Sequence, residues 1–412
     1  MYFRFVEKNP ERLIKLYELW TKLQPHNINA HKDLAYEYTN MKELDKALEE
    51  YLIIRNMDPS SFDIVADIVE IYILQKDFKA AEKLLINYSN NYRENYQSYF
   101  SLGKLYEKMG ELEKAREQYD IASLLEPNIG DIILRSIDLE TKLGNFDLAI
   151  NRLVNLANDN NVTKSEKYSS YQKLYMIYNI LGQLVKSIDS AEKLFQLEPT
   201  WNIESIDDAV ALAHLYIKIG NDHKAKKSID KSAKLFPSNT SESMIGSFRN
   251  IVTASIDIEK ENYKKVLKSV SMIEKLSKDY GFTFLDSRKD KILAQLCEKK
   301  KDYKNALEHY KASITSAPTW GTWEGGTKPR GIGRCHRELK EYSKSVESLL
   351  EVLKLHPYHP KTHYELALSY NEMKNSDKAL EHLQIAIDIW KDADKDYSIA
   401  QDAKKKLEKW ST

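Results

Sequence analysis

Small and large apolar residues recur along this chain with a period of 34 residues. Alanine stands at four successive positions of that period, Ala47, Ala81, Ala115 and Ala149. Within each period the apolar positions are three or four residues apart, which places them on one face of a helix. Proline follows the second apolar run of several periods, and proline cannot continue a helix. The pattern therefore predicts an all-α fold of antiparallel helix pairs without strands.

Two copies carry the pattern most fully. One contains Leu34, Ala35, Tyr38, Ala47, Tyr51 and Pro59, and the other contains Leu102, Gly103, Tyr106, Ala115, Tyr119, Ala122 and Pro127. This alternation of small and large residues resembles the tetratricopeptide repeat (TPR) family. The resemblance implies a right-handed superhelical α-solenoid whose concave groove binds partners. We expect Gly103, Ala115 and Ala122 to be buried, because their small size lets helices approach closely.

The register predicts ten repeats with helices at either end. From Ala149 onward the equivalent position moves by 38 to 41 residues before it returns to 34, which indicates longer helices or turns in the later repeats. The predicted parts are an N-terminal helix or half-repeat at 1–27, four regular repeats at 28–163, five longer repeats at 164–359, a last repeat at 360–393 and a charged capping helix at 394–412.

Charge is balanced overall but uneven along the chain. The whole sequence holds 62 Lys and Arg against 62 Asp and Glu, whereas residues 1–150 hold 19 against 26. The first part is therefore acidic by seven charges and the rest is basic by seven. Sequence drift on solvent-exposed helix faces would explain this difference in charge. An acidic end and a basic end that favour different partners, or head-to-tail self-association, would explain it equally. No apolar run is long enough to predict a membrane span.

Motifs for catalysis or cofactors are missing from the sequence. It has no nucleophile elbow, HExxH, Walker loop or dinucleotide fingerprint, so we expect neither an enzyme nor a bound cofactor. Cys297 and Cys335 lie in no CxxC pair, which favours buried small side chains and a reducing, cytoplasmic location. His356, His359 and His363 are close in sequence, but the intervening prolines argue against a metal site.

The inner-face positions of the TPR family suggest a binding site in the later repeats. In the repeats at 287–320 and 326–359 these positions hold cations. Beside them, residues 318–334 are rich in glycine and depart from the repeat pattern. This segment reads either as a long turn whose tryptophans fill a gap between repeats or as a recognition loop with aromatic anchors. The predicted partner-binding residues are Arg288, Lys291, Lys299, Trp320, Trp323, Arg330, Arg334 and Arg337.

Three functions remain open from the sequence. The first is a non-catalytic scaffold or adaptor that binds a protein or peptide, with an acidic segment held in the C-terminal half of the groove. The second is the regulatory or substrate-recruiting TPR portion of a larger enzyme, because the chain enters a helical pattern almost at once. The third is binding of RNA or another polyanion, which the neutral overall charge disfavours. Neither a small-molecule partner nor a membrane is expected.

Overall fold

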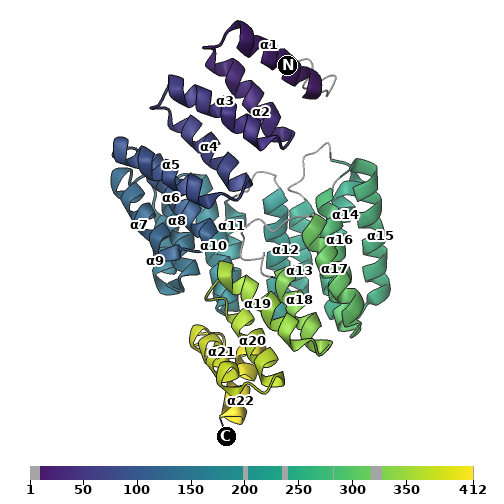
Figure 1. Cartoon of the computed structure of the whole chain (residues 1–412). Coiled ribbons are helices and arrows are strands. Elements are labelled where there is room, and N and C mark those ends of the chain that lie inside the picture. The colour runs from purple at the N-terminus through teal and green to yellow at the C-terminus, as the bar shows by residue number, and fades with distance from the viewer. Residues whose placement is uncertain (1–9, 198–202, 234–239, 282, 317–326, 412) are drawn as a thin grey trace. The chain divides into compact units, whose positions relative to one another are not determined.

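The structure is a computed structural model of the 412-residue chain, and it describes residues 10–197, 203–233, 240–281, 283–316 and 327–411. Within these residues it contains twenty-two helices and no strand, so the predicted all-α class is confirmed (Figure 1). The chain divides into two units, residues 1–139 and 140–412. Consecutive helices pack as antiparallel pairs within each unit.

The first unit contains seven helices and the beginning of an eighth. They are α1 (Pro10–Leu23), α2 (Ile28–Asn40), α3 (Leu44–Met57), α4 (Phe62–Leu74), α5 (Phe78–Asn91), α6 (Tyr96–Met109), α7 (Leu112–Leu125) and α8 (Gly130–Lys142).

The second unit begins within α8 and continues through fourteen further helices. They are α9 (Phe146–Asn158), α10 (Lys164–Ile180), α11 (Leu184–Gln196), α12 (Ile203–Lys218), α13 (Asp222–Ala233), α14 (Glu242–Glu259), α15 (Tyr263–Tyr280), α16 (Thr283–Lys299), α17 (Tyr303–Ser316), α18 (Thr327–Glu338), α19 (Tyr342–Leu355), α20 (Pro360–Glu372), α21 (Ser376–Ile389) and α22 (Ser398–Trp410).

One left-handed residue marks the turn inside every repeat. The following N–H bonds the carbonyl five residues earlier, as from Glu43 to Tyr38 at 2.9 Å, which closes the end of the first helix. Five residues after each left-handed position comes the small residue of the predicted register. The ten turn residues are Lys42, Lys76, Gly110, Gly144, Gly182, Gly220, Glu261, Lys301, Lys340 and Lys374. Their spacing follows the predicted 34-, 38- to 41- and 34-residue steps.

The core confirms the packing expected from the sequence. Ala115 and Ala122 are fully buried, and Gly103 is buried with its Cα against the Tyr119 ring, where a Cβ would lie 2.3 Å from the ring. The extra residues of the later repeats lengthen helices. Helices α10, α12, α14, α15 and α16 contain 16 to 18 residues, whereas α1–α7 contain 13 or 14.

In the second unit the last helices pack against much earlier turns. Tyr397 lies over Gly182, and Tyr358 lies over Gly144, at positions where a Cβ would come within 3 Å of the ring. The indole Nε1–H of Trp390 donates to the carbonyl of Ile180 at 3.0 Å. Helix α22 therefore does more than shield the end of the array. It begins at Ser398 rather than at 394, and its Ala400 and Ala403 join a core shared with α10–α13.

Candidate functional site

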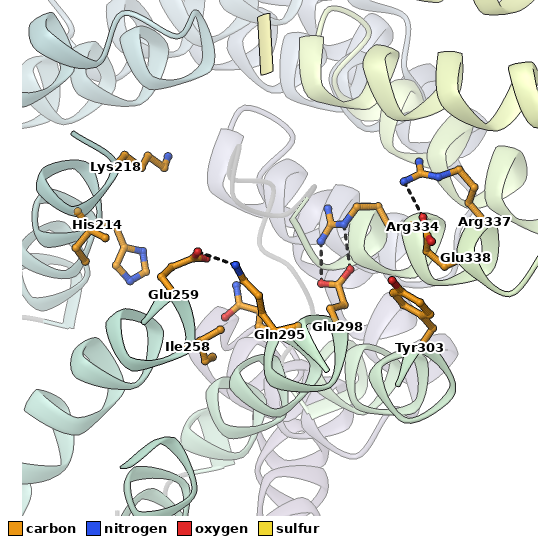
Figure 2. A pocket seen from close by; sticks show the side chains of 12 residues that line it. His214, Lys218, Ile258, Glu259, Gln295, Glu298, Tyr303, Arg334, Arg337 and Glu338 are labelled. Carbon is orange, nitrogen blue, oxygen red and sulfur yellow. Dashed lines mark hydrogen bonds and ion pairs between the residues drawn. The ribbon is translucent and has the colours of Figure 1, made fainter. Parts of the chain in front are cut away.

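A cavity of about 710 Å³ opens among the first helices of four successive repeats in the second unit. Helices α12, α14, α16 and α18 supply its walls together with Tyr303 at the start of α17, and Figure 2 shows their side chains pointing into the same space. Its lining comprises His214, Ile217, Lys218, Ile258, Glu259, Gln295, Glu298, Lys299, Tyr303, Arg334, Arg337 and Glu338.

The repeat register explains which side chains line the cavity. Two residues before each left-handed turn come Lys218, Glu259, Lys299 and Glu338, one from each helix. Opposite charges thus alternate along this row, and Lys299 Nζ pairs with Glu259 across repeats at 2.8 Å. This row lies at the C-terminal ends of four parallel helices.

A second row changes from apolar to charged along the same wall. Three residues before each turn come Ile217 and Ile258, followed by Glu298 and Arg337. In this row the end at α12 and α14 is apolar and the end at α16 and α18 is charged, whereas the first row is charged throughout. A single face with both characters can hold a segment that carries an apolar and a charged group.

Arg334 and Arg337 are bound to carboxylates at the charged end. Arg334 donates through Nε and Nη2 to the two oxygens of Glu298, each at 3.0 Å, in a bidentate pair. Arg337 pairs with Glu365 of α20. Burial lowers the pKa of Arg334, but the carboxylates of Glu365 and Glu298 outweigh burial and hold its pKa above the ordinary arginine value. These guanidinium groups are thus fixed in place before any partner arrives.

Arg330 lies apart from the cavity lining. Its side chain is buried, with 8% of the residue exposed, and its Nη1 is 2.9 Å from Nε2 of His359. Burial and the neighbouring charge of Arg334 lower the pKa of Arg330 to about 10. The sequence placed Arg330 beside Arg334 and Arg337 as a surface contact, whereas in the structure its side chain is buried and does not line the cavity.

The structure brings together some of the predicted site residues and leaves others apart. Lys299, Arg334 and Arg337 line the cavity, whereas Arg288 and Lys291 are half-buried on α16 and do not line it. Trp320 and Trp323 lie outside the described residues. Residues 327–334, which the sequence assigned both to the non-repeat segment 318–334 and to the first helix of the repeat at 326–359, form the beginning of α18.

Sequence reasoning missed several residues of the cavity. Lys218 and Glu259 could have been found, because they occupy the register position of Lys299 in earlier repeats. The role of Glu298 and Glu365 as partners of the arginines could not, since it depends on how neighbouring helices pack. Both cysteines are inside helices as expected, and burial raises the pKa of the Cys335 thiol to about 12.

The described residues also bear on a metal site and on a membrane span. No group of three or more His, Cys, Asp or Glu side chains there is arranged to hold a metal ion. No described helix is both long enough and apolar enough to cross a membrane.

Comparison with known proteins supports the repeat assignment. Two family models described as tetratricopeptide repeat match this chain, one at residues 96–128, 209–239 and 292–319 and the other at 362–393. Over 141 residues, 31% of this chain, the sequence is 30% identical to the human protein O-mannosyl-transferase TMTC3. The match spans 15% of that relative's length.

The solved structures that match this chain are distant in sequence. The yeast Tom70 structure is 14% identical, with 93% of this chain and 95% of that chain covered and a TM-score of 0.39. The TPR domain of P58(IPK) is 15% identical, with 93% and 98% covered and a TM-score of 0.29. The family models match four separate repeats, and the turn register continues between them through both units. The chain is therefore a tetratricopeptide repeat protein.

Proposed function

We propose that this protein is a non-catalytic scaffold or adaptor that binds a segment of another protein in the cavity of its second unit. The observation that carries this proposal is the lining itself, which is apolar at Ile217 and Ile258 and charged at Arg334 and Arg337. Burial of apolar side chains supplies affinity, and fixed guanidinium groups supply orientation. A partner with an apolar residue beside an acidic one fits both ends.

The preference for an acidic segment has a physical limit. Arg334 and Arg337 already contact Glu298 and Glu365, so an incoming carboxylate shares these arginines with them. Lys218 and Lys299, at the exposed edge of the same cavity, add positive charge that an acidic segment meets first. We infer that charge orients the partner and that the apolar end contributes most of the binding.

Binding of designed peptides tests this function. Fluorescence anisotropy would measure the dissociation constants of 12-residue peptides that pair an apolar anchor with acidic residues, against peptides with lysine in their place. We expect tighter binding of the acidic set, weakened about tenfold by Arg334→Glu and unchanged by Lys344→Glu, since the Lys344 side chain is exposed on α19. Affinity should also fall between low and physiological salt. Equal binding of both peptide sets would refute the acidic preference, and no binding of either would refute the cavity as the site.

A second function is favoured by the match to the human mannosyl-transferase. The match covers only a small part of that longer protein. We therefore also consider that this chain is a TPR portion that recruits substrates to an enzyme. The intact mass of the native protein separates the two functions. A mass well above 47.9 kDa together with transferase activity supports the recruiting role, and a mass of 47.9 kDa without activity supports the adaptor. A cytoplasmic location and head-to-tail association through the unequal charge of the two ends remain predictions.

A further inference from the structure

A smaller cavity, of about 260 Å³, lies among α9, α10 and α11 of the second unit and shares no lining residue with the cavity described above. Its apolar part comes from Val154 and Ala157 of α9 and from Leu174 of α10. Tyr178 of α10 and Lys186 of α11 also line it. The volume is below the roughly 300–1,000 Å³ of sites for small molecules, so the smaller cavity suits a single side chain.

Tyr178 and Lys186 form a pair that recurs along the repeats, four residues before and four residues after the left-handed turn. The ammonium of Lys186 lies 5.5 Å from the centroid of the Tyr178 ring, in a cation–π contact. The equivalent pairs are Tyr38 with Lys46, Tyr106 with Lys114 and Tyr216 with Lys224, at 5.2, 5.3 and 5.3 Å. A fifth pair, Tyr370 with Lys378, differs because the ring of His382 stacks against the tyrosine.

The tyrosine of this pair has lost the carboxylate that its equivalents contact. The hydroxyls of Tyr38, Tyr106 and Tyr216 donate to glutamates of the preceding second helix, which are Glu18, Glu82 and Glu192. Glu192 stands 24 residues before Tyr216, and the residue 24 positions before Tyr178 is Val154. In the part of the chain that the structure describes, the hydroxyl of Tyr178 has no hydrogen-bond partner.

The lysine of the pair has lost its carboxylate as well. Lys46 and Lys114 each pair at 2.5 Å with the glutamate that follows the left-handed residue, and Lys224 pairs with Glu192 at 3.6 Å. In the repeat of Lys186 the residue after the left-handed Gly182 is Gln183. Two carboxylates are thus replaced by neutral residues at one cavity.

We propose that the smaller cavity binds one glutamate side chain of another protein. The carboxylate accepts from the hydroxyl of Tyr178 and from the ammonium of Lys186, as Glu192 does in the next repeat. Its methylene groups pack on the apolar lining. Asp189, a carboxylate of the lining, is paired with Lys193 at 2.9 Å, so the lining retains one net positive charge that a single glutamate neutralises.

Peptide binding to the intact chain tests this pocket. Two fluorescein-labelled 12-residue peptides are compared, both apolar and uncharged apart from a central glutamate in one and a glutamine in the other. We expect the glutamate peptide to bind about tenfold more tightly in fluorescence anisotropy, because the amide leaves the charge of Lys186 uncompensated. Equal dissociation constants, or no binding of either peptide, would overturn the proposal.

Substitutions in the lining identify the contacts. Lys186→Met and Tyr178→Phe should each weaken binding of the glutamate peptide by about five- to tenfold. Val154→Glu should abolish it, because the new carboxylate takes the place of the ligand. Leu148→Glu is the matched control, since it adds the same charge to α9 at an exposed position outside the lining, and it should bind as wild type. If Val154→Glu binds as well as Leu148→Glu, the smaller cavity is not the site.

A variant of the larger cavity separates this inference from the proposed function, on which it does not rest. Arg334→Glu should leave the affinity for the glutamate peptide unchanged. Loss of binding in Arg334→Glu with full binding in Val154→Glu would place the glutamate in the larger cavity and overturn the pocket. The reverse result supports the pocket whether or not the adaptor function holds.

Discussion

Helices α2 and α20 each carry a histidine at the same position of the repeat, and the two histidines have different hydrogen-bond partners. His31 and His363 are equivalent in the repeat register, and each places Nε2 near the carbonyl of the proline six residues earlier, at 3.1 and 2.7 Å. Nineteen residues later comes the partner of Nδ1, which is Glu50 for His31 and His382 for His363. A single difference in the second helix of the repeat, Glu50 against His382, therefore gives the two equivalent histidines different electrostatic environments.

The two partners differ in hydrogen-bonding capacity. Around His31 both neighbours, the carbonyl of Pro25 and the carboxylate of Glu50, only accept hydrogen bonds. Around His363, Nε2–H donates to Pro357 and Nδ1 must accept from Nδ1–H of His382, at 2.9 Å. That pair is consistent only while the His363 ring is neutral, and burial lowers the pKa of His363 to about 4.

The largest expected effect is therefore loss of stability in acid around α20. The pKa of His363 lies below its unfolded value near 6.5, so its contribution is complete above pH 6.5 and is lost as pH falls toward 4. His356 shares this direction, because burial lowers its pKa to about 4 as well. We expect a loss on the order of 3 kcal/mol between pH 7 and 4, measured by hydrogen exchange of α20 amides.

Exchange of the partners tests the cause. His382→Glu gives α20 the arrangement of α2, so its amides should lose much less protection in acid. Glu50→His should make α2 more sensitive to acid. If the acid response of α20 is the same with Glu at 382, the histidine pair is not its source.

A second difference concerns the left-handed glycine turns, because the segment after α21 packs over one of them and not over another. Tyr397 lies over Gly182, where a Cβ would be 2.5 Å from the ring, whereas the same turn position at Gly110 has nothing within 4 Å. Both glycines are left-handed, with φ of 73° and 79°. Alanine therefore strains both alike, and Gly182→Ala should cost about 1–3 kcal/mol more than Gly110→Ala in urea unfolding. Equal costs would show that this contact contributes nothing to stability.

The small core residues should instead respond alike to substitution in the repeats that contain α2 and α20. Ala47 and Ala379 are equivalent and essentially unexposed, as is Ala115 in a third repeat. Leucine at any of them overpacks a helix pair by roughly 1–3 kcal/mol, visible as a lower urea midpoint. An unchanged midpoint at one site would show that its repeat can expand to accept the larger side chain.

The repeat register was predictable because it rests on local patterns that every repeat must satisfy. Ala149 and Val266 reveal it through spacing alone, even though the tyrosine of the first helix is missing from their repeats. The burial of Arg330 and its contact with His359 were not predictable, because packing between repeats decides which face of a helix becomes buried. The hydrogen bond of Trp390 with Ile180 joins residues 210 positions apart, and no periodic pattern in the sequence predicts it.

The smallest expected effect concerns the lysines at the left-handed turns that follow α2 and α20. Lys42 and Lys374 are left-handed, with φ of 62° and 58°, and the next N–H closes each helix end at 2.9 and 3.0 Å. A left-handed side chain costs roughly 1–2 kcal/mol, and glycine relieves this but loses about 0.5–1 kcal/mol to its greater freedom when unfolded. Lys42→Gly and Lys374→Gly should each raise the unfolding free energy by about 0.5 kcal/mol, measured in urea. Alanine at the same sites keeps the left-handed cost and should give no gain. A gain from alanine equal to that from glycine would mean that the lysine side chain, and not its backbone conformation, is unfavourable there.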